Sequence, residues 1–282
     1  MEKQVALRPI TKWVGGKRQL LPELHSLMPS SYDIDSNTYF EPFLGGGAML
    51  FSLAPKKAVI NDLNADLINL YRVVRDKPEE LLKLLEEHQA NNSKEYYLKV
   101  RAEDRNENFS NLTKVERAAR LLYMLKVDFN GMYRVNSKGQ FNVPYGRYKN
   151  PKIADYENIM TVSEYLNKKG VEIYHENFSE TVQKADKGDL VYFDPPYIPL
   201  SETANFTSYT SEGFNNKDQE ELRDLFFKLS NRGVNVMLSN SDTPKTREMY
   251  AKANIHEVQA NRAINSNAKK RGKIGELIIT NY

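Results

Sequence analysis

The sequence of 282 residues contains no cysteine and only four histidines. The lack of cysteine excludes disulfide bonds and thiolate metal sites. The histidines are scattered and lack the i, i+4 pairing of a helical metal site, so we interpret them as surface or packing residues and predict no metal ion. They are His25, His88, His175 and His256.

Long apolar runs are also missing. No stretch of eighteen or more apolar residues occurs, which argues against a membrane-spanning helix. The N-terminal string MEKQVALRPITKW has no apolar stretch followed by a small-residue cleavage site, so nothing in it predicts export. We therefore expect a soluble, cytoplasmic protein without a membrane partner.

The net charge of +3 is modest and does not by itself identify a nucleic-acid-binding protein. Its distribution is more informative, because residues 126–152 contain six basic residues and one acid, interleaved with five aromatic residues. Basic side chains neutralise phosphates and aromatic rings stack on bases, although a solvated face over ordinary core aromatics has the same composition. A second basic cluster comprises Lys269, Lys270, Arg271 and Lys273.

Hydrophobic periodicity predicts an α/β chain. A strand at 38–41, a glycine-rich turn, a helix from about Ala48 and a strand at 57–61 form one βαβ unit, so the sheet should be parallel there. Other expected elements are a helix at 17–27 ended by Pro29, a helical block at 65–125, a β-hairpin at 133–143, strands at 171–174, 190–193, 234–238 and 275–280, and helices at 178–184 and 217–231.

The simplest organisation is a doubly wound α/β domain made from both ends of the chain. Its predicted parts are residues 1–65 and 155–282, and the helical and hairpin region at 66–154 is predicted to be an insertion.

The string EPFLGGGA, residues 41–48, follows a predicted strand and opens a predicted helix. Glycines let a ligand approach the backbone, and open α/β sheets bind cofactors beyond the strand ends. Asp62, at the end of the next strand, can accept hydrogen bonds from both hydroxyls of a ribose. The string departs from the G-x-G-x-x-G of a dinucleotide site and lacks the ending of a P-loop. A nicotinamide or ATP site and a tight turn without a ligand stay as alternatives.

The sharpest feature is the apolar strand 190–193 followed by Asp194, Pro195, Pro196 and Tyr197. The two prolines remove backbone donors and leave carbonyls facing the cleft beyond the strand. Such a site suits the exocyclic amine of adenine, whose two hydrogens can bond to the Asp194 carboxylate and the Pro195 carbonyl while Tyr197 stacks on the base. The structural alternative is a turn in which Asp194 caps a helix. We interpret Ser239–Asp242 as a helix-capping turn and not as a nucleophile site.

Several strings in order resemble the Dam-type DNA adenine methyltransferases of the D12 class, across nearly the whole chain. They are TKWVGGK from Thr11, EPFLGGGAMLF, VINDLN, FNGMYRVN, FNVPYGRYK, VYFDPPYIPLSETANFTSY and LSNSDT. The resemblance implies a Rossmann-like methyltransferase domain with an inserted helical and β-hairpin DNA-recognition domain. It also implies S-adenosyl-L-methionine as the cofactor and double-stranded DNA as the partner.

The resemblance assigns roles residue by residue. The catalytic string corresponds to Asp194, Pro195, Pro196 and Tyr197. The cofactor-pocket residues correspond to Trp13, Lys17, Glu41, Phe43, Gly45, Asp62, Asn177, Phe178 and Asp194. Asn177 stands where the family often has an acidic residue. The DNA-contacting positions correspond to Lys12, Asn130, Met132, Arg134, Pro144, Arg147 and Tyr148.

The resemblance points to methylation of adenine N6 within GATC by base flipping, and Arg134 suits a bidentate contact to guanine. It also allows a cognate restriction endonuclease as a partner, and otherwise a monomer. Methylation of RNA adenine, cytosine N4 or a protein glutamine is the alternative within enzymes. The last two families commonly carry Ser or Asn at the Asp194 position. A DNA-binding module without turnover is the alternative from another class.

Overall fold

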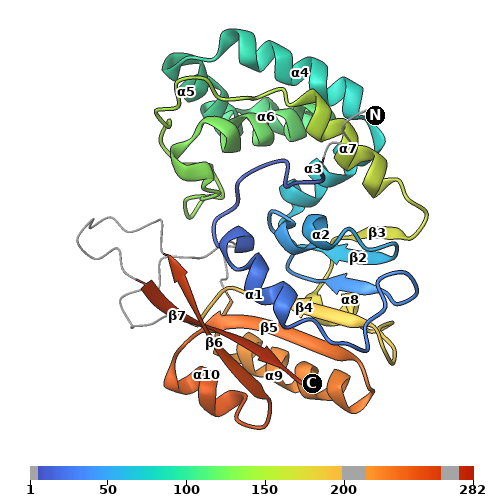
Figure 1. Ribbon diagram of the computed structural model, residues 1–282. Helices are drawn as coiled ribbons and strands as arrows, with labels where there is room; N and C mark the ends of the chain where they lie inside the picture. The colour runs from blue at the N-terminus through green and yellow to red at the C-terminus, as the bar shows by residue number, and fades with distance from the viewer. Residues whose placement is uncertain (1–5, 199–213, 262–272) are drawn as a thin grey trace. The chain divides into compact units, whose positions relative to one another are not determined.

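The computed structural model describes residues 6–198, 214–261 and 273–282. The chain packs into two compact units that each combine distant parts of the sequence. Unit 1 comprises Met1–Gly16, Gly45–Ala54 and Asp62–His175, and unit 2 comprises Lys17–Leu44, Pro55–Asn61 and Glu176–Tyr282. The fold is mixed α/β with a seven-stranded sheet (Figure 1), as the sequence predicts.

Unit 2 contributes six strands in the order β2-β1-β4-β5-β7-β6. Strands β2, β1, β4 and β5 are parallel neighbours, whereas β7 is antiparallel to both β5 and β6. The strands are β1 (Tyr39–Glu41), β2 (Ala58–Asn61), β4 (Leu190–Phe193), β5 (Asn235–Ser241), β6 (Asn254–Asn261) and β7 (Lys273–Thr280).

The central strands are buried throughout. Every residue of β1, β2, β4 and β5 is buried, as expected for parallel strands covered on both faces. Because β1 and β4 are parallel neighbours, their carboxyl ends lie at one edge of the sheet, and Glu41 and Asp194 are placed there. The chain order reverses between these strands, which is where open α/β sheets bind ligands.

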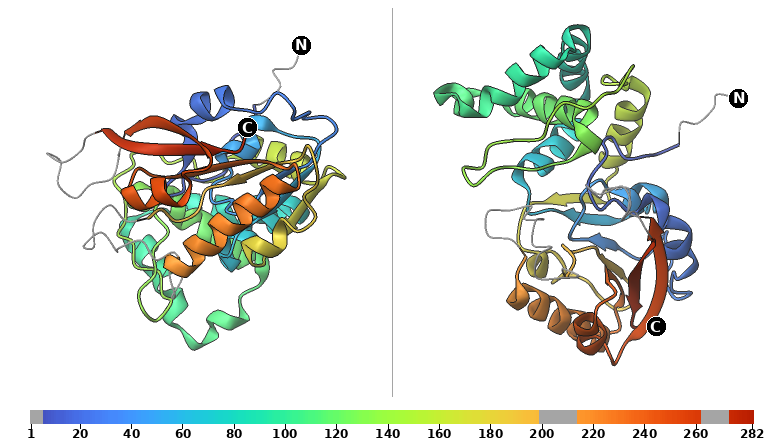
Figure 2. Two further views of the ribbon diagram at one scale, coloured as in Figure 1. Left: turned by 90° about the horizontal axis from the view of Figure 1, so that it is seen from below. Right: turned by 90° about the vertical axis from the view of Figure 1, so that its left-hand side faces the viewer.

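The helices of unit 2 are short except one. They are the 3₁₀ helix η1 (Lys17–Gln19), α1 (Leu21–Ser26), α8 (Phe178–Thr181), α9 (Asn216–Asn231) and α10 (Pro244–Met249). Helix α9, orange in Figure 2, packs against β5. A capping box of Asn215 and Asp218 defines the start of α9.

Unit 1 is mainly helical. It contains α2 (Ala48–Leu53), α3 (Ala65–Asp76), α4 (Pro78–Asn91), α5 (Lys94–Ala102), η2 (Glu103–Arg105), η3 (Glu107–Asn111), α6 (Lys114–Val127), η4 (Phe129–Gly131), α7 (Tyr156–Leu166) and strand β3 (Val171–Tyr174). Helix α6 is buried on most sides and packs against α3 and α4, and α3 also packs against α7. No helix in the described part of the chain is long and apolar enough to cross a membrane.

Two predicted helices need correction. The helix expected at 17–27 is split into η1 and α1, with Pro22 in the first turn of α1, a position where proline suits a helix start. The helix expected at 178–184 ends at Thr181. The hairpin predicted at 133–143 is present as a short antiparallel pairing. Val135 bridges Phe141, and the N–H groups of Asn136 and Asn142 donate to the carbonyls of Gln140 and Arg134 at 2.8 and 3.1 Å. Helices α7 and α10 and strand β6 were not predicted.

Candidate functional site

Asp194 follows β4 directly, and its carboxylate is paired with Lys17. The Nζ of Lys17 lies 2.8 Å from Oδ1 of Asp194, and the two side chains are 7% and 19% exposed. Burial raises the pKa of Asp194, and Glu276 adds to the rise, while the Lys17 ammonium opposes it. The nearby ammonium therefore favours the ionised carboxylate against the cost of burial.

Tyr197 lies against the same lysine. The Lys17 Nζ is 4.7 Å from the centre of the Tyr197 ring, within the range of a cation–π contact. The Tyr197 hydroxyl donates a hydrogen bond to Oε2 of Glu276 in β7 at 2.9 Å. Burial, followed by the nearby charges of Asp194 and Glu276, raises the pKa of Tyr197 well above its usual value, so the hydroxyl stays protonated as a donor.

The two prolines between these residues differ in their surroundings. The Pro196 carbonyl accepts a hydrogen bond from Nε2 of Gln219 in α9 at 2.9 Å. Pro195 is buried and Pro196 is half-buried. Of the two proline carbonyls, that of Pro196 is therefore already bound within the protein.

The carboxyl end of β1 carries Glu41 and Phe43. Glu41 is 3% exposed, and its Oε2 accepts a hydrogen bond from the Tyr39 hydroxyl at 2.9 Å. Phe43 stacks on Phe178 with ring centres 5.3 Å apart, and it meets Phe214 edge-on at 5.7 Å. Unit 2 therefore places a buried acid and an aromatic cluster beside the strand end that Asp194 follows.

Asn177 immediately precedes Phe178 and caps α8. Its Oδ1 accepts hydrogen bonds from the backbone N–H and from the hydroxyl of Ser179, both at 2.9 Å. The amide oxygen thus has a structural use, which an acidic side chain at this position would share.

Unit 1 places Trp13, Gly45 and Asp62 together. Gly45 has φ +48°, and its N–H donates to Oδ2 of Asp62 at 2.9 Å. The other Asp62 oxygen accepts from the N–H of Asn64 at 2.9 Å. Burial raises the pKa of Asp62, and the two backbone donors oppose the rise.

The glycine at position 45 also meets a packing requirement. A Cβ there would lie 2.8 Å from Cδ1 of Trp13, closer than side-chain atoms pack. Trp13 itself stacks on Tyr133, with ring centres 5.4 Å apart and planes 24° from parallel. The turn therefore needs glycine for the indole ring as well as for its left-handed backbone.

The predicted DNA-contacting residues of unit 1 are mostly exposed. Lys12 and Tyr148 meet, with Nζ 3.5 Å from the hydroxyl and 4.7 Å from the ring centre. Arg134 donates from Nε to Oδ1 of Asn142 at 2.7 Å, and from Nη2 to the Asn142 carbonyl at 3.2 Å. The exposed members are Lys12, Asn130, Arg134, Pro144 and Arg147, and the half-buried members are Met132 and Tyr148.

The turn that carries Asn130 is built on a buried acid. Asn130 has φ 65°, and Oδ1 of Asp128 accepts the N–H of Met132 at 3.1 Å. Asp128 is fully buried, and its Oδ2 has no hydrogen-bond partner among the described residues. Burial raises the pKa of Asp128 to about 8.

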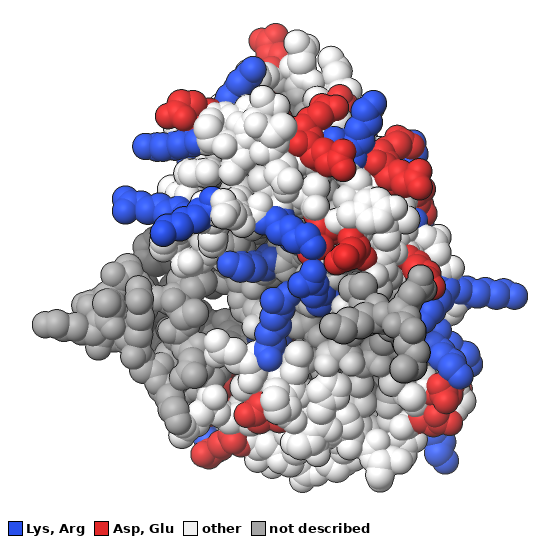
Figure 3. All heavy atoms as spheres, turned by 45° about the horizontal axis from the view of Figure 1, so that its top comes forward, with Lys and Arg blue, Asp and Glu red and all other residues white. Residues whose placement is uncertain are grey.

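The basic, aromatic stretch at 126–152 is mixed in character. Phe141 is a core residue, whereas Phe129 is 50% exposed, so the stretch contains both core and surface aromatic residues. Figure 3 shows that Lys and Arg side chains gather in groups on one face of the molecule. Of the second basic cluster, Lys269, Lys270 and Arg271 lie outside the described residues.

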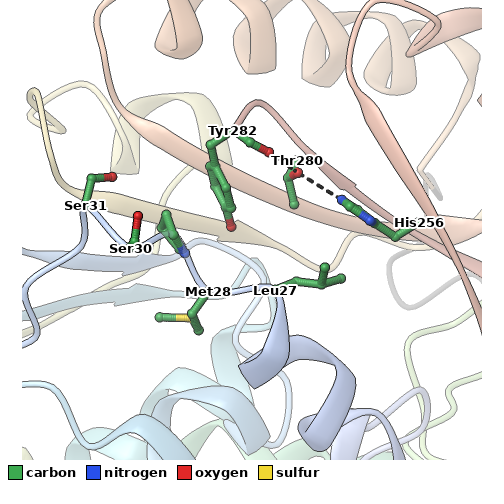
Figure 4. A pocket seen from close by; sticks show the side chains of 8 residues that line it. Leu27, Met28, Ser30, Ser31, His256, Thr280 and Tyr282 are labelled. Atoms are coloured by element: carbon green, nitrogen blue, oxygen red, sulfur yellow. Dashed lines mark hydrogen bonds between the residues drawn. The ribbon is translucent and has the colours of Figure 1, made fainter.

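A pocket of about 320 Å³ in unit 2 is lined by none of the predicted site residues. Figure 4 shows it between the 27–31 loop and the C-terminal strand, with His256 bonded to Thr280. His88 is a packing residue: its ring stacks on Tyr123 at 4.7 Å, and burial lowers its pKa to about 4. The described residues contain no group of three or more His, Asp or Glu side chains that could hold a metal ion.

Comparison with known proteins agrees with this arrangement. The family model for D12 class N6 adenine-specific DNA methyltransferases matches residues 13–264. The chain belongs to this family. It is 58% identical over 281 residues to a type II methyltransferase, M1.LlaDCHI, of Lactococcus lactis subsp. cremoris, covering 100% of this chain and 98% of that protein.

Two more distant relatives also align over nearly their whole length. The type II methyltransferase M.MjaIII of Methanocaldococcus jannaschii is 43% identical over 290 residues, which is 98% of this chain and 99% of that protein. The DNA adenine methylase of Escherichia coli (strain K12) is 34% identical over 274 residues, which is 96% of this chain and 94% of that protein. The resemblance inferred from the motifs is thus confirmed at the level of the family.

For this family member, the sequence did not reveal the partners of the catalytic string. The pairing of Lys17 with Asp194 and the bonds of Gln219 and Glu276 join residues far apart in the chain. One signal was available, because Ser239, Asn240 and Ser241 are polar residues that directly follow the predicted strand at 234–238. They are buried in β5, and the cap of α10 is Thr243, so interpreting 239–242 as the capping turn was wrong.

Proposed function

We propose that this protein transfers a methyl group from S-adenosyl-L-methionine to N6 of adenine in double-stranded DNA. The observation that carries the proposal is the buried group of Asp194, Lys17 and Tyr197 at the carboxyl end of β4, in a member of the adenine-N6 methyltransferase family. An acidic oxygen beside an aromatic ring suits an amine on a planar base.

The residues of each unit fit parts of the cofactor. In unit 2, the buried Glu41 carboxylate suits the amino group of the methionine part, and the cluster of Phe43 and Phe178 suits a flat adenine ring. In unit 1, Asp62 keeps lone pairs beyond its two backbone bonds for the hydroxyls of a ribose. Trp13, Lys17, Gly45 and Asn177 complete the proposed set. When bound, the cofactor supplies a methyl group already activated on a sulfonium.

The protein's own part in the reaction is to orient the amine. The Asp194 carboxylate and the Pro195 carbonyl accept the two N6 hydrogens, and Tyr197 stacks on the base. Hydrogen bonds of this kind favour a pyramidal amine whose lone pair can attack, and fixed placement supplies most of the acceleration. The nitrogen loses its proton as the new bond forms, and Asp194 is the proposed acceptor. The base reaches this pocket by rotating out of the duplex.

We propose the inserted region at 66–154 as the DNA-recognition domain, with 1–65 and 155–282 as the catalytic domain. The proposed DNA contacts are Lys12, in the catalytic part, and six residues of the inserted region: Asn130, Met132, Arg134, Pro144, Arg147 and Tyr148. The contact of Lys12 with Tyr148 and the bonds of Arg134 to Asn142 support this role, because they order exposed side chains before DNA arrives. GATC is the proposed site.

The names of the relatives suggest two biological settings. Those from Lactococcus lactis and Methanocaldococcus jannaschii are called type II methyltransferases, which favours a restriction-modification system with a cognate endonuclease as the functional partner. The protein itself is proposed to act as a monomer.

A methyl-transfer assay tests the proposal. Wild-type protein should move labelled methyl groups from S-adenosyl-L-methionine to adenine of a GATC duplex, and plasmid from expressing cells should resist a methylation-sensitive GATC nuclease. Asp194→Ala should abolish transfer while duplex binding persists. Label on cytosine, on RNA or on protein would refute the proposal, and so would an active Asp194→Ala variant.

A further inference from the structure

The backbone on both sides of Tyr197 is held by buried side chains from α9 and β5. Nε2 of Gln219 donates to the Pro196 carbonyl at 2.9 Å. Oδ1 of Asn240 accepts the N–H of Ile198 at 3.1 Å, and the Ser241 hydroxyl donates to the Ile198 carbonyl at 2.5 Å. Three backbone groups next to Tyr197 are therefore fixed by side chains.

The two amides are joined to each other. Nδ2 of Asn240 donates to Oε1 of Gln219 at 3.3 Å. Gln219 is 3% exposed and Asn240 is fully buried. Water therefore has little access to compete for these bonds, and a group left without its partner would be costly.

The direction of every hydrogen bond in this network follows from the two backbone groups at its ends. A carbonyl such as that of Pro196 only accepts, so Gln219 must turn its NH₂ toward it. The Gln219 oxygen then faces the Asn240 NH₂, which leaves the Asn240 oxygen for the N–H of Ile198. Each amide has one orientation that satisfies its neighbours, so the network specifies the backbone path through Pro196 and Ile198.

Tyr197 is the residue between these anchored groups. Its hydroxyl is bound by Glu276, and its ring faces Lys17, the partner of Asp194. Any shift of the 196–198 backbone would therefore move the ring and change the surroundings of the ion pair.

We propose that Gln219 and Asn240 are positioning residues, which fix Tyr197 and through it the Lys17–Asp194 pair for methyl transfer. The inference rests on the proposed function in one respect, because methyl transfer is the reaction on which positioning is measured. Neither residue has to touch the substrate or the cofactor for this role.

Gln219→Met is the first test, because methionine has a similar length and no hydrogen-bonding amide. The single-turnover rate of methyl transfer should fall roughly 10- to 100-fold, as expected for a displaced reacting group. Dissociation constants for S-adenosyl-L-methionine and for a GATC duplex should be unchanged. An unchanged rate in folded Gln219→Met would overturn the proposal.

Asn235→Leu is the matched control at the opposite end of β5. Asn235 is also a buried amide, and it bonds the carbonyls of Gly188 and Asp189 and the Ser31 hydroxyl. At equal fraction folded, its loss should leave the single-turnover rate unchanged. Equal rate losses in both variants would reduce Gln219 to a stabilising residue.

Gln219→Glu adds a pH test. The ionised side chain repels the Pro196 carbonyl, but the protonated form can donate to it as the amide does. The rate relative to wild type should therefore rise as the pH is lowered. A rate ratio independent of pH would contradict the directional network.

A measurement without catalysis separates this proposal from the proposed function. Protein labelled with 3-fluorotyrosine gives a fluorine NMR resonance for Tyr197, identified among the 17 tyrosines by its loss in Tyr197→Phe. The resonance should shift or broaden in Gln219→Met and stay in place in Asn235→Leu. An inactive wild type would refute the proposed function only, whereas an unmoved resonance in Gln219→Met would refute the positioning role.

Discussion

Asp194 in unit 2 and Asp128 in unit 1 are aspartates removed from water, yet their surroundings differ. Asp194 has the Lys17 ammonium 2.8 Å away, whereas Asp128 is held by backbone N–H groups and leaves one oxygen without a partner among the described residues. Burial raises the pKa of both, and that of Asp128 reaches about 8. The Lys17 ammonium opposes the rise at Asp194, whereas at Asp128 backbone N–H groups and the charge of Lys12 oppose it and the pKa still rises.

The largest expected effect comes from removing that cation. Lys17→Met withdraws the charge that opposes the rise in the pKa of Asp194, so the pKa should increase further and less carboxylate should remain at neutral pH. We expect the single-turnover methyl-transfer rate near pH 7 to fall roughly 10- to 100-fold at saturating cofactor, with the acid limb of the rate profile moved to higher pH.

Lys56→Met is the control for Lys17→Met, because Lys56 forms an ion pair with Asp35 in which both side chains are more than half exposed. Its rate profile should match wild type, since exposed pairs contribute little. An acid limb that stays in place in Lys17→Met would show that Lys17 does not set the charge of Asp194.

The turn around Asp128 should be sensitive to backbone strain. Gly131 has φ +65°, and a Cβ there would lie 2.5 Å from Cβ of Lys12. Gly131→Ala should lower the free energy of unfolding by about 2–4 kcal/mol, as strain and overlap add, measured by urea unfolding. Gly139 has φ +73° with open space around it, so Gly139→Ala should lower the free energy of unfolding by only about 1–2 kcal/mol. Equal losses would mean that contact with Lys12 is unimportant.

Replacing Arg134 tests whether the region around Asp128 contributes to recognition of the DNA sequence. Arg134→Ala should reduce discrimination at one guanine of the site by about 1–3 kcal/mol, measured as kcat/KM on duplexes with single base changes. Cofactor binding should be unaffected. Uniform weakening on all duplexes would make Arg134 a phosphate contact.

The last prediction concerns the pH dependence of stability. The Asp128 carboxyl titrates near 3.8 when unperturbed and at about 8 in the folded protein. Its neutral form is favoured by folding, so its contribution to stability is full below about pH 4, declines as the pH rises and is lost by about pH 8. Asp128→Asn should therefore gain thermal stability relative to wild type across this window. Parallel melting curves at all pH values would contradict the burial of a neutral acid.

Much of the sheet could be predicted because its strands are short apolar runs with clear ends. The strand at 190–193 and the prolines after it located β4 and the catalytic string without reference to the rest of the chain. The same logic failed for β6, Asn254–Asn261, because its sequence mixes polar and apolar residues at the edge of the sheet. Helix α7 was not predicted, although its buried residues Ile159, Val162 and Leu166 recur at helical spacing; no side-chain cap marks its start.

The chemistry of the site was predicted residue by residue, but its pairings were not. Lys17 was expected in the cofactor pocket, and its ion pair with Asp194 depends on how η1 approaches β4, which no local pattern encodes. The hydrogen bonds of Gln219 and Glu276 also depend on how distant elements pack, so no local pattern predicts them. The glycine at 45 could be predicted from the motif, but its contact with Trp13 could not.

The capping box at the start of α9 has a consequence for how the family can vary. Asn215 and Asp218 bond each other's backbone N–H groups, so the first turn of the helix is defined by its own residues. Gln219 follows directly, and its phase on the helix does not depend on the number of residues that precede Phe214. Family members that replace Asn215 or Asp218 would therefore need another way to start α9 if the Gln219 amide is to reach the Pro196 carbonyl.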